Sequence, residues 1–130
     1  MTDASKGNIL LIDDDKFLVE MYGAKFNSAG YTTQICLTAK EALDALGGGF
    51  APIALLFDIT MPEMDGLEFM QQVVEKHLAD DALKVALTNQ NSDQERARAT
   101  ELGVGLYIVK ASVIPSEVVA QVTAMLHKEH

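Results

Sequence analysis

Short apolar runs recur along the chain, and each is followed by a stretch in which apolar residues return every three or four positions. An apolar run fits a strand buried on both faces of a parallel sheet, and the longer spacing fits one face of a helix. The predicted strands are 8–12, 31–36, 53–57, 83–87 and 105–109. The predicted helices begin near Asp15, Thr38, Leu67, Ser92 and Pro115. Five strands alternating with five helices predict an α/β fold with a doubly wound parallel sheet and right-handed crossovers.

Local signals refine the helix boundaries. Gly30 and Gly103 stand where glycine commonly follows a helix, and Pro115 suits a first turn. Two pairs have the spacing of a capping box, Thr38 with Glu41 and Ser92 with Glu95. The first predicted helix has an apolar face of Leu18, Met21, Tyr22, Phe26 and Ala29, and the third has Leu67, Met70, Val73, Val74 and Leu78. The helix beginning near Ser92 has the weakest apolar face, which fits either a mobile element or an ordinary surface helix.

Polar residues directly follow four of the apolar runs. Asp13 and Asp14 follow the first run, Asp58 the third, Thr88 the fourth and Lys110 the fifth. Because ligands of doubly wound sheets bind at the carboxyl ends of the strands, we expect these side chains to share one pocket. Three neighbouring carboxylates repel one another, and oxygen ligands without histidine or thiolate favour Mg²⁺. The pattern therefore predicts a magnesium site.

The same residues suggest phosphoryl chemistry. An aspartate beside a metal ion and a lysine is equipped to attack phosphorus and form an aspartyl phosphate, with Asp58 as the nucleophile. Lys110 can pair with Asp58 or with a phosphoryl oxygen, and the Thr88 hydroxyl can donate to the same oxygen. The sequence has no G-x-x-x-x-G-K-[ST] nucleotide loop and no acid placed to protonate a leaving group. ATP is therefore not the expected direct donor.

Length and charge narrow the class of protein. The 130 residues fit a single domain, predicted to span 1–130 with 1–7 as a flexible tail. A net charge of −9 argues against a surface that binds nucleic acid or anionic membranes. Cys36 is the only cysteine, which suits the cytoplasm, and no signal peptide or membrane span is expected. The histidines lack metal-ligand spacing and are predicted to lie on the surface, at His77, His127 and His130.

Four segments, taken in order, resemble the response-regulator receiver family. They are Ile-Leu-Leu-Ile-Asp-Asp-Asp, Leu-Leu-Phe-Asp-Ile-Thr-Met-Pro-Glu-Met-Asp-Gly, Val-Ala-Leu-Thr and Tyr-Ile-Val-Lys. The resemblance covers essentially the whole chain and implies a flavodoxin-like sheet with strand order 2-1-3-4-5. It also implies that Asp58 accepts the phosphoryl group, which Lys110 contacts. The implied Mg²⁺ ligands are Asp13, Asp14, Asp58 and the backbone carbonyl of Thr60.

The resemblance further implies a switch and its partners. Thr88 would be drawn toward the phosphoryl group while Tyr107 turns inward. This change would remodel the face made by the helix beginning near Ser92, the strand 105–109 and the last helix, where a downstream protein binds. A histidine kinase or histidine phosphotransfer protein would be the donor. The chain would then catalyse only its own phosphorylation and dephosphorylation, as a stand-alone receiver or as a piece of a longer protein.

Two positions depart from the family pattern. Ala111 follows Lys110 where the family usually has a cis proline. Because a non-proline cis bond costs about 2.5–4 kcal/mol, we predict a trans bond or a strained cis bond there. Asn89 replaces a residue that is usually small, and we predict that it narrows access to Asp58 and slows phosphorylation or hydrolysis.

Other interpretations of single residues remain. Asp15 is interpreted as a helix N-cap rather than a metal ligand, and Pro62 and Asp65-Gly66 as turn formers.

A phosphatase of the haloacid-dehalogenase type would carry a second aspartate where this chain has Thr60. A pseudo-receiver, which binds partners without being phosphorylated, would usually lack some of the acidic residues that this chain keeps.

Overall fold

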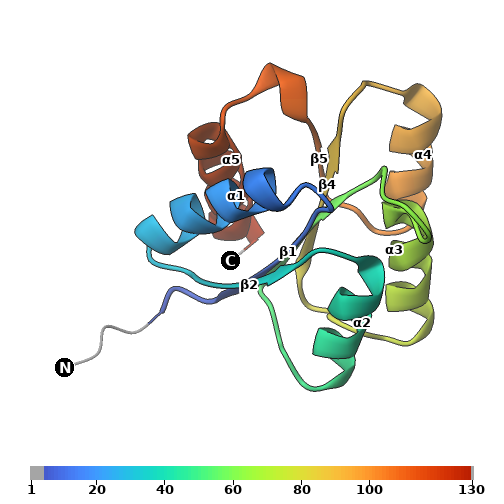
Figure 1. The fold of residues 1–130 in the computed structure, drawn as a ribbon, viewed down its shortest axis with the longest axis horizontal. Coiled ribbons are helices and arrows are strands. Elements are labelled where there is room, and N and C mark those ends of the chain that lie inside the picture. The colour runs from blue at the N-terminus through green and yellow to red at the C-terminus, as the bar shows by residue number, and fades with distance from the viewer. Residues whose placement is uncertain (1–4, 130) are drawn as a thin grey trace.

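The computed structural model describes residues 5–129, and its strands form one five-stranded parallel sheet (Figure 1). The strands are β1 (Asn8–Ile12), β2 (Thr32–Cys36), β3 (Ala54–Asp58), β4 (Leu83–Thr88) and β5 (Leu106–Val109). Their order is β2-β1-β3-β4-β5, so the predicted doubly wound topology is confirmed. Asp58 and Thr88 are the last residues of β3 and β4 rather than the first residues after them, which places both in the strand ladder.

Helices cover both faces of this sheet (Figure 1). On one face lie α1 (Lys16–Ser28) and α5 (Pro115–Glu129), and on the other lie α2 (Ala39–Gly47), α3 (Gly66–Glu75) and α4 (Asp93–Glu101). A single 3-10 turn, Lys110–Ser112, connects β5 to α5. The predicted alternation of strands and helices is therefore confirmed along the described chain.

Two hydrophobic cores explain why the central strands are continuous apolar runs. In β1, Ile9 and Leu11 pack with α1 and α5, whereas Leu10 and Ile12 pack with α2 and α3. In β3 every residue is buried. Successive side chains of a strand point to opposite faces, so a strand covered on both faces needs apolar residues at every position. Cys36, at the end of β2, is buried in the second core, and burial raises the pKa of its thiol to about 11.

The predicted apolar faces of α1 and α3 are each wrong at their edges. Met21 and Val74 were expected in the core, but they are 38% and 44% exposed. The buried stripe of α1 is filled by Val19, Tyr22, Gly23 and Phe26, and that of α3 by Gly66, Phe69, Met70 and Val73. Leu78 lies beyond α3, because the helix ends at Glu75 and His77 takes a left-handed backbone conformation with φ of 54°.

The capping signals are confirmed only in part. The Thr38 hydroxyl accepts a hydrogen bond from the Glu41 N–H at 3.1 Å, but the Glu41 carboxylate accepts from the Leu37 N–H instead of closing the box. A complete capping box occurs at the start of α3, where a turn was expected. There Asp65 and Glu68 each accept a hydrogen bond from the other's backbone N–H, at 2.8 and 3.0 Å. Asp65 and Gly66 therefore begin a helix.

The first described residues are hydrogen-bonded to the turn between α1 and β2, and the described histidines lie on the surface. The Lys6 N–H donates to Gly30 O and the Thr32 N–H donates to Gly7 O, both at 3.0 Å, which ties residues 6 and 7 to the turn between α1 and β2. Residues 1–4 of the expected tail, and His130, lie outside the described residues. His77 and His127 are exposed, as predicted. Among the described residues, no helix is both long enough and apolar enough to cross a membrane.

Gly66 lets α3 approach the end of β3 very closely. Its N–H donates to the carbonyl of Ile59 at 2.8 Å. A Cβ atom at this position would clash with the carbonyl oxygen of Asp58 and lie 2.9 Å from the Cα of Ile59. Both obstacles are backbone atoms, which cannot rotate away as a flexible side chain could. The backbone that carries Asp58 is therefore held directly against the first residue of a helix.

We expect Gly66→Ala to lower the free energy of unfolding by about 1–3 kcal/mol, the usual cost of overpacking a tight site. Urea unfolding followed by circular dichroism measures this change. Gly47→Ala is the matched control, because Gly47 is also helical and no atom lies within 4 Å of its added Cβ. Equal stability of the two variants would contradict the close approach at Gly66.

Candidate functional site

An acidic cluster, defined as Asp13, Asp14 and Asp58, lies at the carboxyl ends of β1 and β3. Asp13 and Asp58 are buried and Asp14 is exposed. One carboxylate oxygen of each residue lies within 4.8 Å of the others. The structure thus brings together the three carboxylates that the sequence placed at one edge of the sheet. Oxygen atoms at this spacing suit a hard divalent cation such as Mg²⁺.

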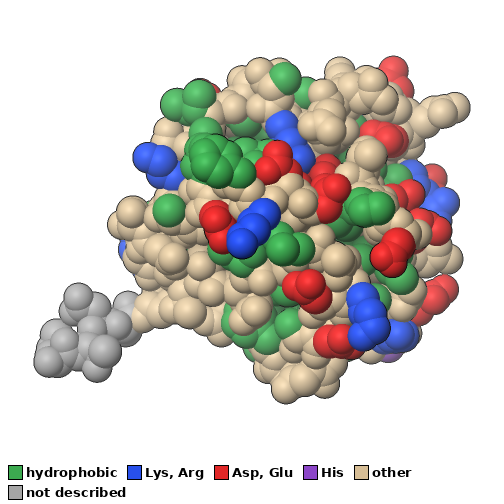
Figure 2. Space-filling model, viewed as in Figure 1, with side chains coloured by type: hydrophobic (Ala, Val, Ile, Leu, Met, Phe, Trp, Pro, Cys, Tyr) green, Lys and Arg blue, Asp and Glu red, His purple; other side chains and the backbone are tan. Residues whose placement is uncertain are grey.

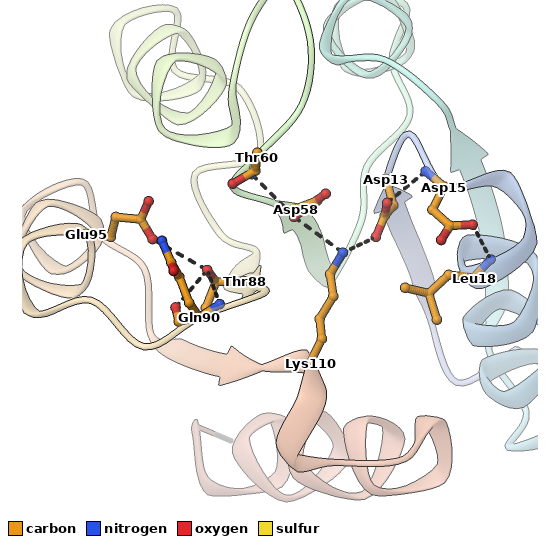
Figure 3. Close-up of polar contacts among 9 residues, drawn as sticks. All are labelled: Asp13, Asp15, Leu18, Asp58, Thr60, Thr88, Gln90, Glu95 and Lys110. Carbon is orange, nitrogen blue, oxygen red and sulfur yellow. Dashed lines mark hydrogen bonds and ion pairs between the residues drawn. The ribbon is translucent and has the colours of Figure 1, made fainter.

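Lys110 lies between the two buried carboxylates (Figure 3). Its Nζ is 2.7 Å from Asp13 Oδ2 and 3.3 Å from Asp58 Oδ1. The expected pairing with Asp58 is present, but the shorter contact is with Asp13. The Lys110–Ala111 peptide bond is trans, one of the two predicted alternatives, and Lys110 opens the 3-10 turn that leads to α5. The lysine therefore supplies the positive charge that two adjacent buried carboxylates require.

Backbone N–H groups fix the orientation of both buried carboxylates. Asp13 Oδ1 accepts from the Asp15 N–H at 2.9 Å, and Asp58 Oδ1 accepts from the Thr60 N–H at 3.3 Å. The side chain of Asp15 caps α1 by accepting from the Leu18 N–H at 3.1 Å, which confirms its predicted role. The predicted use of the Thr60 carbonyl as a metal ligand stays a prediction.

The surroundings of Asp58 disfavour the ionised form of its carboxyl group. Burial and, to a smaller extent, the negative charge of Asp13 raise the pKa of Asp58 to about 6, against the opposing effects of Lys110 and the Thr60 N–H. Burial alone lowers the pKa of Lys110, but its hydrogen bond to Asp13 and the charges of both aspartates outweigh burial and raise it. One lysine therefore leaves the cluster with excess negative charge, which favours a bound cation.

The Thr88 hydroxyl lies at the expected strand end but is directed toward α4 instead of toward Asp58 (Figure 3). It donates to Gln90 O at 3.0 Å and contacts Glu95 Oε1 at 3.4 Å. The strand pattern placed the residue correctly, whereas its side-chain direction is set by local acceptors. Glu95 was interpreted only as the second half of a capping box. Its N–H does donate to Ser92 Oγ at 3.3 Å, but its carboxylate accepts a hydrogen bond from the Thr88 hydroxyl.

Tyr107 is half-buried on β5 and is held by the segment that follows β4. Its hydroxyl donates to Gln90 O at 3.5 Å, and the guanidinium of Arg96 lies 4.3 Å from its ring centroid. Sequence reasoning missed Gln90 and Arg96. No sequence signal identified them, because a backbone carbonyl acceptor and a ring-stacking arginine leave no characteristic spacing.

The surface of the molecule agrees with the acidic composition. On the face shown in Figure 2, Asp and Glu side chains are spread over several elements, and Lys and Arg side chains are scattered among them. A nucleic-acid surface needs basic side chains clustered along one face. This face does not have that distribution.

Comparisons with known proteins agree with the geometry. The family model for the response regulator receiver domain matches residues 9–123. Response regulator MprA of Mycolicibacterium vanbaalenii is 30% identical over 120 residues, which cover 92% of this chain and 50% of that protein. MprA of Mycobacterium avium is 31% identical over 120 residues, which are 51% of its length. The chain thus spans about half the length of the curated relatives it matches.

Solved structures show the same fold. A CheY-like response regulator receiver domain protein from Methanospirillum hungatei superimposes with a TM-score of 0.85 and 25% identity, over 96% of each chain. A response regulator, described as putative, from Chloroflexus aurantiacus has a TM-score of 0.81 and 27% identity, over 93% of this chain and 98% of that one.

The raised pKa of Asp58 predicts how stability varies with pH. The folded protein binds this proton more tightly than the unfolded chain does, so the carboxylate costs stability above pH 6 and the cost disappears as pH falls toward 4. A shift from 3.8 to about 6 corresponds to roughly 3 kcal/mol. In EDTA at pH 8, Asp58→Asn should therefore be more stable than the wild type by up to about 3 kcal/mol, and the difference should shrink at pH 5.

Urea unfolding at pH 5 and pH 8 measures this difference. Asp81→Asn is the control, because Asp81 is exposed and lies outside the cluster. A stability gain in Asp58→Asn that does not depend on pH would contradict the charge argument.

Proposed function

The chain belongs to the response regulator receiver domain family, and we propose that Asp58 is the residue on which it accepts a phosphoryl group. Receiver domains act in two-component phosphorelay signalling. The observation that carries the proposal is the position of Asp58, a buried carboxylate at the end of β3, 3.3 Å from Lys110 Nζ and grouped with Asp13 and Asp14. Asp13 is also buried and lies 2.7 Å from Lys110 Nζ, and the assignment to Asp58 follows the resemblance of the segment that ends β3 to the receiver family.

The transfer step uses few groups. A carboxylate oxygen of Asp58 attacks the phosphorus of a phosphohistidine, the phosphorus–nitrogen bond breaks, and its electron pair stays on the imidazole of the donor, which takes a proton. Asp13, Asp14, Asp58 and the Thr60 carbonyl would hold Mg²⁺, which neutralises charge on the phosphoryl oxygens when bound. Lys110, already between Asp13 and Asp58, supplies a second positive charge to those oxygens.

Response regulator receiver domains interact with kinases or phosphotransfer proteins. For this chain we propose a histidine kinase or histidine phosphotransfer protein as donor, and a downstream protein that binds the face of α4, β5 and α5. We propose no nucleic-acid or membrane contact, which the net charge of −9 supports.

The chain would act on no substrate beyond its own phosphoryl group, and so would be a signalling module rather than an enzyme.

We propose that residues 1–130 form one receiver domain, whether alone or as part of a longer protein. A cytoplasmic location is supported by the single cysteine, Cys36, which is buried as a free thiol.

Incubation with Mg²⁺ and acetyl phosphate should add one phosphoryl group to the wild type, detected by intact mass spectrometry. Asp58→Asn should show no such adduct, because an amide cannot form the acyl phosphate. Asp81→Asn, an exposed control, should keep the adduct. If neither acetyl phosphate nor a phosphorylated histidine kinase modifies the wild type, the chain is instead a pseudo-receiver that binds partners without being phosphorylated.

Asn89 is exposed and directly follows Thr88, the last residue of β4. We expect Asn89→Ala to speed phosphorylation by acetyl phosphate or loss of the phosphoryl group, because a smaller side chain widens access to Asp58. Time courses of the phosphorylated fraction measure both rates. Rates equal to those of the wild type would contradict a gating role for Asn89.

A further inference from the structure

Two adjacent residues of α4 contact the two residues interpreted as the switch. We propose that Glu95 and Arg96 are positioning residues that hold Thr88 and Tyr107 away from Asp58 until a phosphoryl group arrives. This inference rests on the proposed function of Asp58. It gives Glu95 a role beyond the predicted capping box and adds Arg96, which no sequence motif singles out.

The Thr88 hydroxyl is fully engaged on the α4 side. The side chain is only 1% exposed, so water cannot replace a lost partner. Its proton is shared between Gln90 O at 3.0 Å and Glu95 Oε1 at 3.4 Å, and its oxygen accepts from the Gln90 N–H at 3.3 Å. Hydrogen bonds to a charged group are stronger than neutral ones. Movement of Thr88 toward Asp58 therefore requires the bond to Glu95 to break.

Glu95 makes this contact in place of its usual helix-capping contact. It is the third residue of α4 after the N-cap Ser92, a position from which glutamate commonly reaches back to the N-cap backbone. Glu68 makes that reciprocal bond at the start of α3. In α4 only the Ser92 half of the box is present, and the Glu95 carboxylate extends to Thr88 (Figure 3). The glutamate is thus committed to the end of β4 rather than to its own helix.

Arg96 contacts the ring of Tyr107, as Glu95 contacts the hydroxyl of Thr88. Its guanidinium lies 4.3 Å from the ring centroid, a cation–π distance, and the tyrosine hydroxyl donates to Gln90 O at 3.5 Å. The Gln90 carbonyl therefore accepts from both Thr88 and Tyr107. Because Glu95 and Arg96 are consecutive, a shift of the first turn of α4 disturbs both contacts together.

These polar contacts matter because α4 has little apolar packing. Ala99 is the one residue of this helix that is buried, whereas α1 buries four. A further polar contact, Arg98 to Gln71 at 3.2 Å, connects α4 to α3. With so small an apolar contribution, the contacts of Glu95 and Arg96 provide a large share of what fixes the position of this helix.

The contacts of Glu95 and Arg96 are therefore coupled thermodynamically to binding of a phosphoryl group at Asp58. Contacts made only in the free state oppose binding of a phosphoryl group, and removing them raises affinity by the same factor. We expect Glu95→Ala to bind beryllium fluoride, a phosphoryl analogue, about 5-fold or more tightly than the wild type in the presence of Mg²⁺. Isothermal titration calorimetry measures the affinity, and circular dichroism checks that the variant is folded.

Asp93→Ala is the matched control. Asp93 is an exposed acid in the same first turn of α4, so its removal reproduces the loss of a negative charge at the start of the helix without removing a hydrogen bond of Thr88. Its affinity should equal that of the wild type. Glu95→Gln keeps an uncharged acceptor of the same length and should fall between the wild type and Glu95→Ala.

A double-variant cycle separates positioning from a merely structural role. In a Thr88→Ala background, Glu95→Ala should no longer change the affinity for beryllium fluoride, because the group that Glu95 holds is gone. An effect that persists there, or an affinity of Glu95→Ala that is equal to or weaker than that of the wild type, would overturn the proposal. Failure of the wild type itself to bind the analogue would instead contradict the proposed function of Asp58.

Discussion

The contact of Lys110 with Asp13 and Asp58 is the interaction on which the rest of this structure depends. Two carboxylates are buried side by side, and a single ammonium group lies 2.7 and 3.3 Å from them. A buried carboxylate pair without a counter-charge would take up a proton or destabilise the fold. The sheet therefore has to bring the residues at the ends of β1, β3 and β5 to one point. The backbone contacts of Asp15, Thr60 and Gly66 keep those residues in place.

The fold and the charged part of the site could be predicted because they depend on patterns repeated over many residues. Continuous apolar runs identify strands buried on both faces, and a charged residue at the end of such a run lies at the ligand-binding edge. Asp13, Asp58 and Lys110 meet as that reasoning requires. The direction of the Thr88 side chain could not be predicted in the same way. A hydroxyl rotates toward whichever acceptor is near, and here the acceptors are a loop carbonyl and a helix carboxylate.

The two faces of the sheet differ in how firmly they hold their helices. On one face, α1 buries Val19, Tyr22, Gly23 and Phe26, and α5 packs in the same core. On the other face, α4 is attached mainly through side-chain hydrogen bonds and the stacking of Arg96 on Tyr107. Apolar packing responds little to a new charge at a distance, whereas hydrogen bonds and ion contacts respond directly. The element best placed to respond to Asp58 is thus the one held by polar contacts.

The burial of Cys36 shields the one thiol of this chain from solvent. The thiol lies in the core beside α2 with a pKa of about 11, so at physiological pH it is protonated and shielded from solvent. Oxidants and thiol reagents react with the exposed thiolate, a form that this residue does not present. Since Cys36 is the only cysteine, the folded chain presents no reactive thiol. A cysteine introduced on the surface of α4 would therefore report on that helix alone.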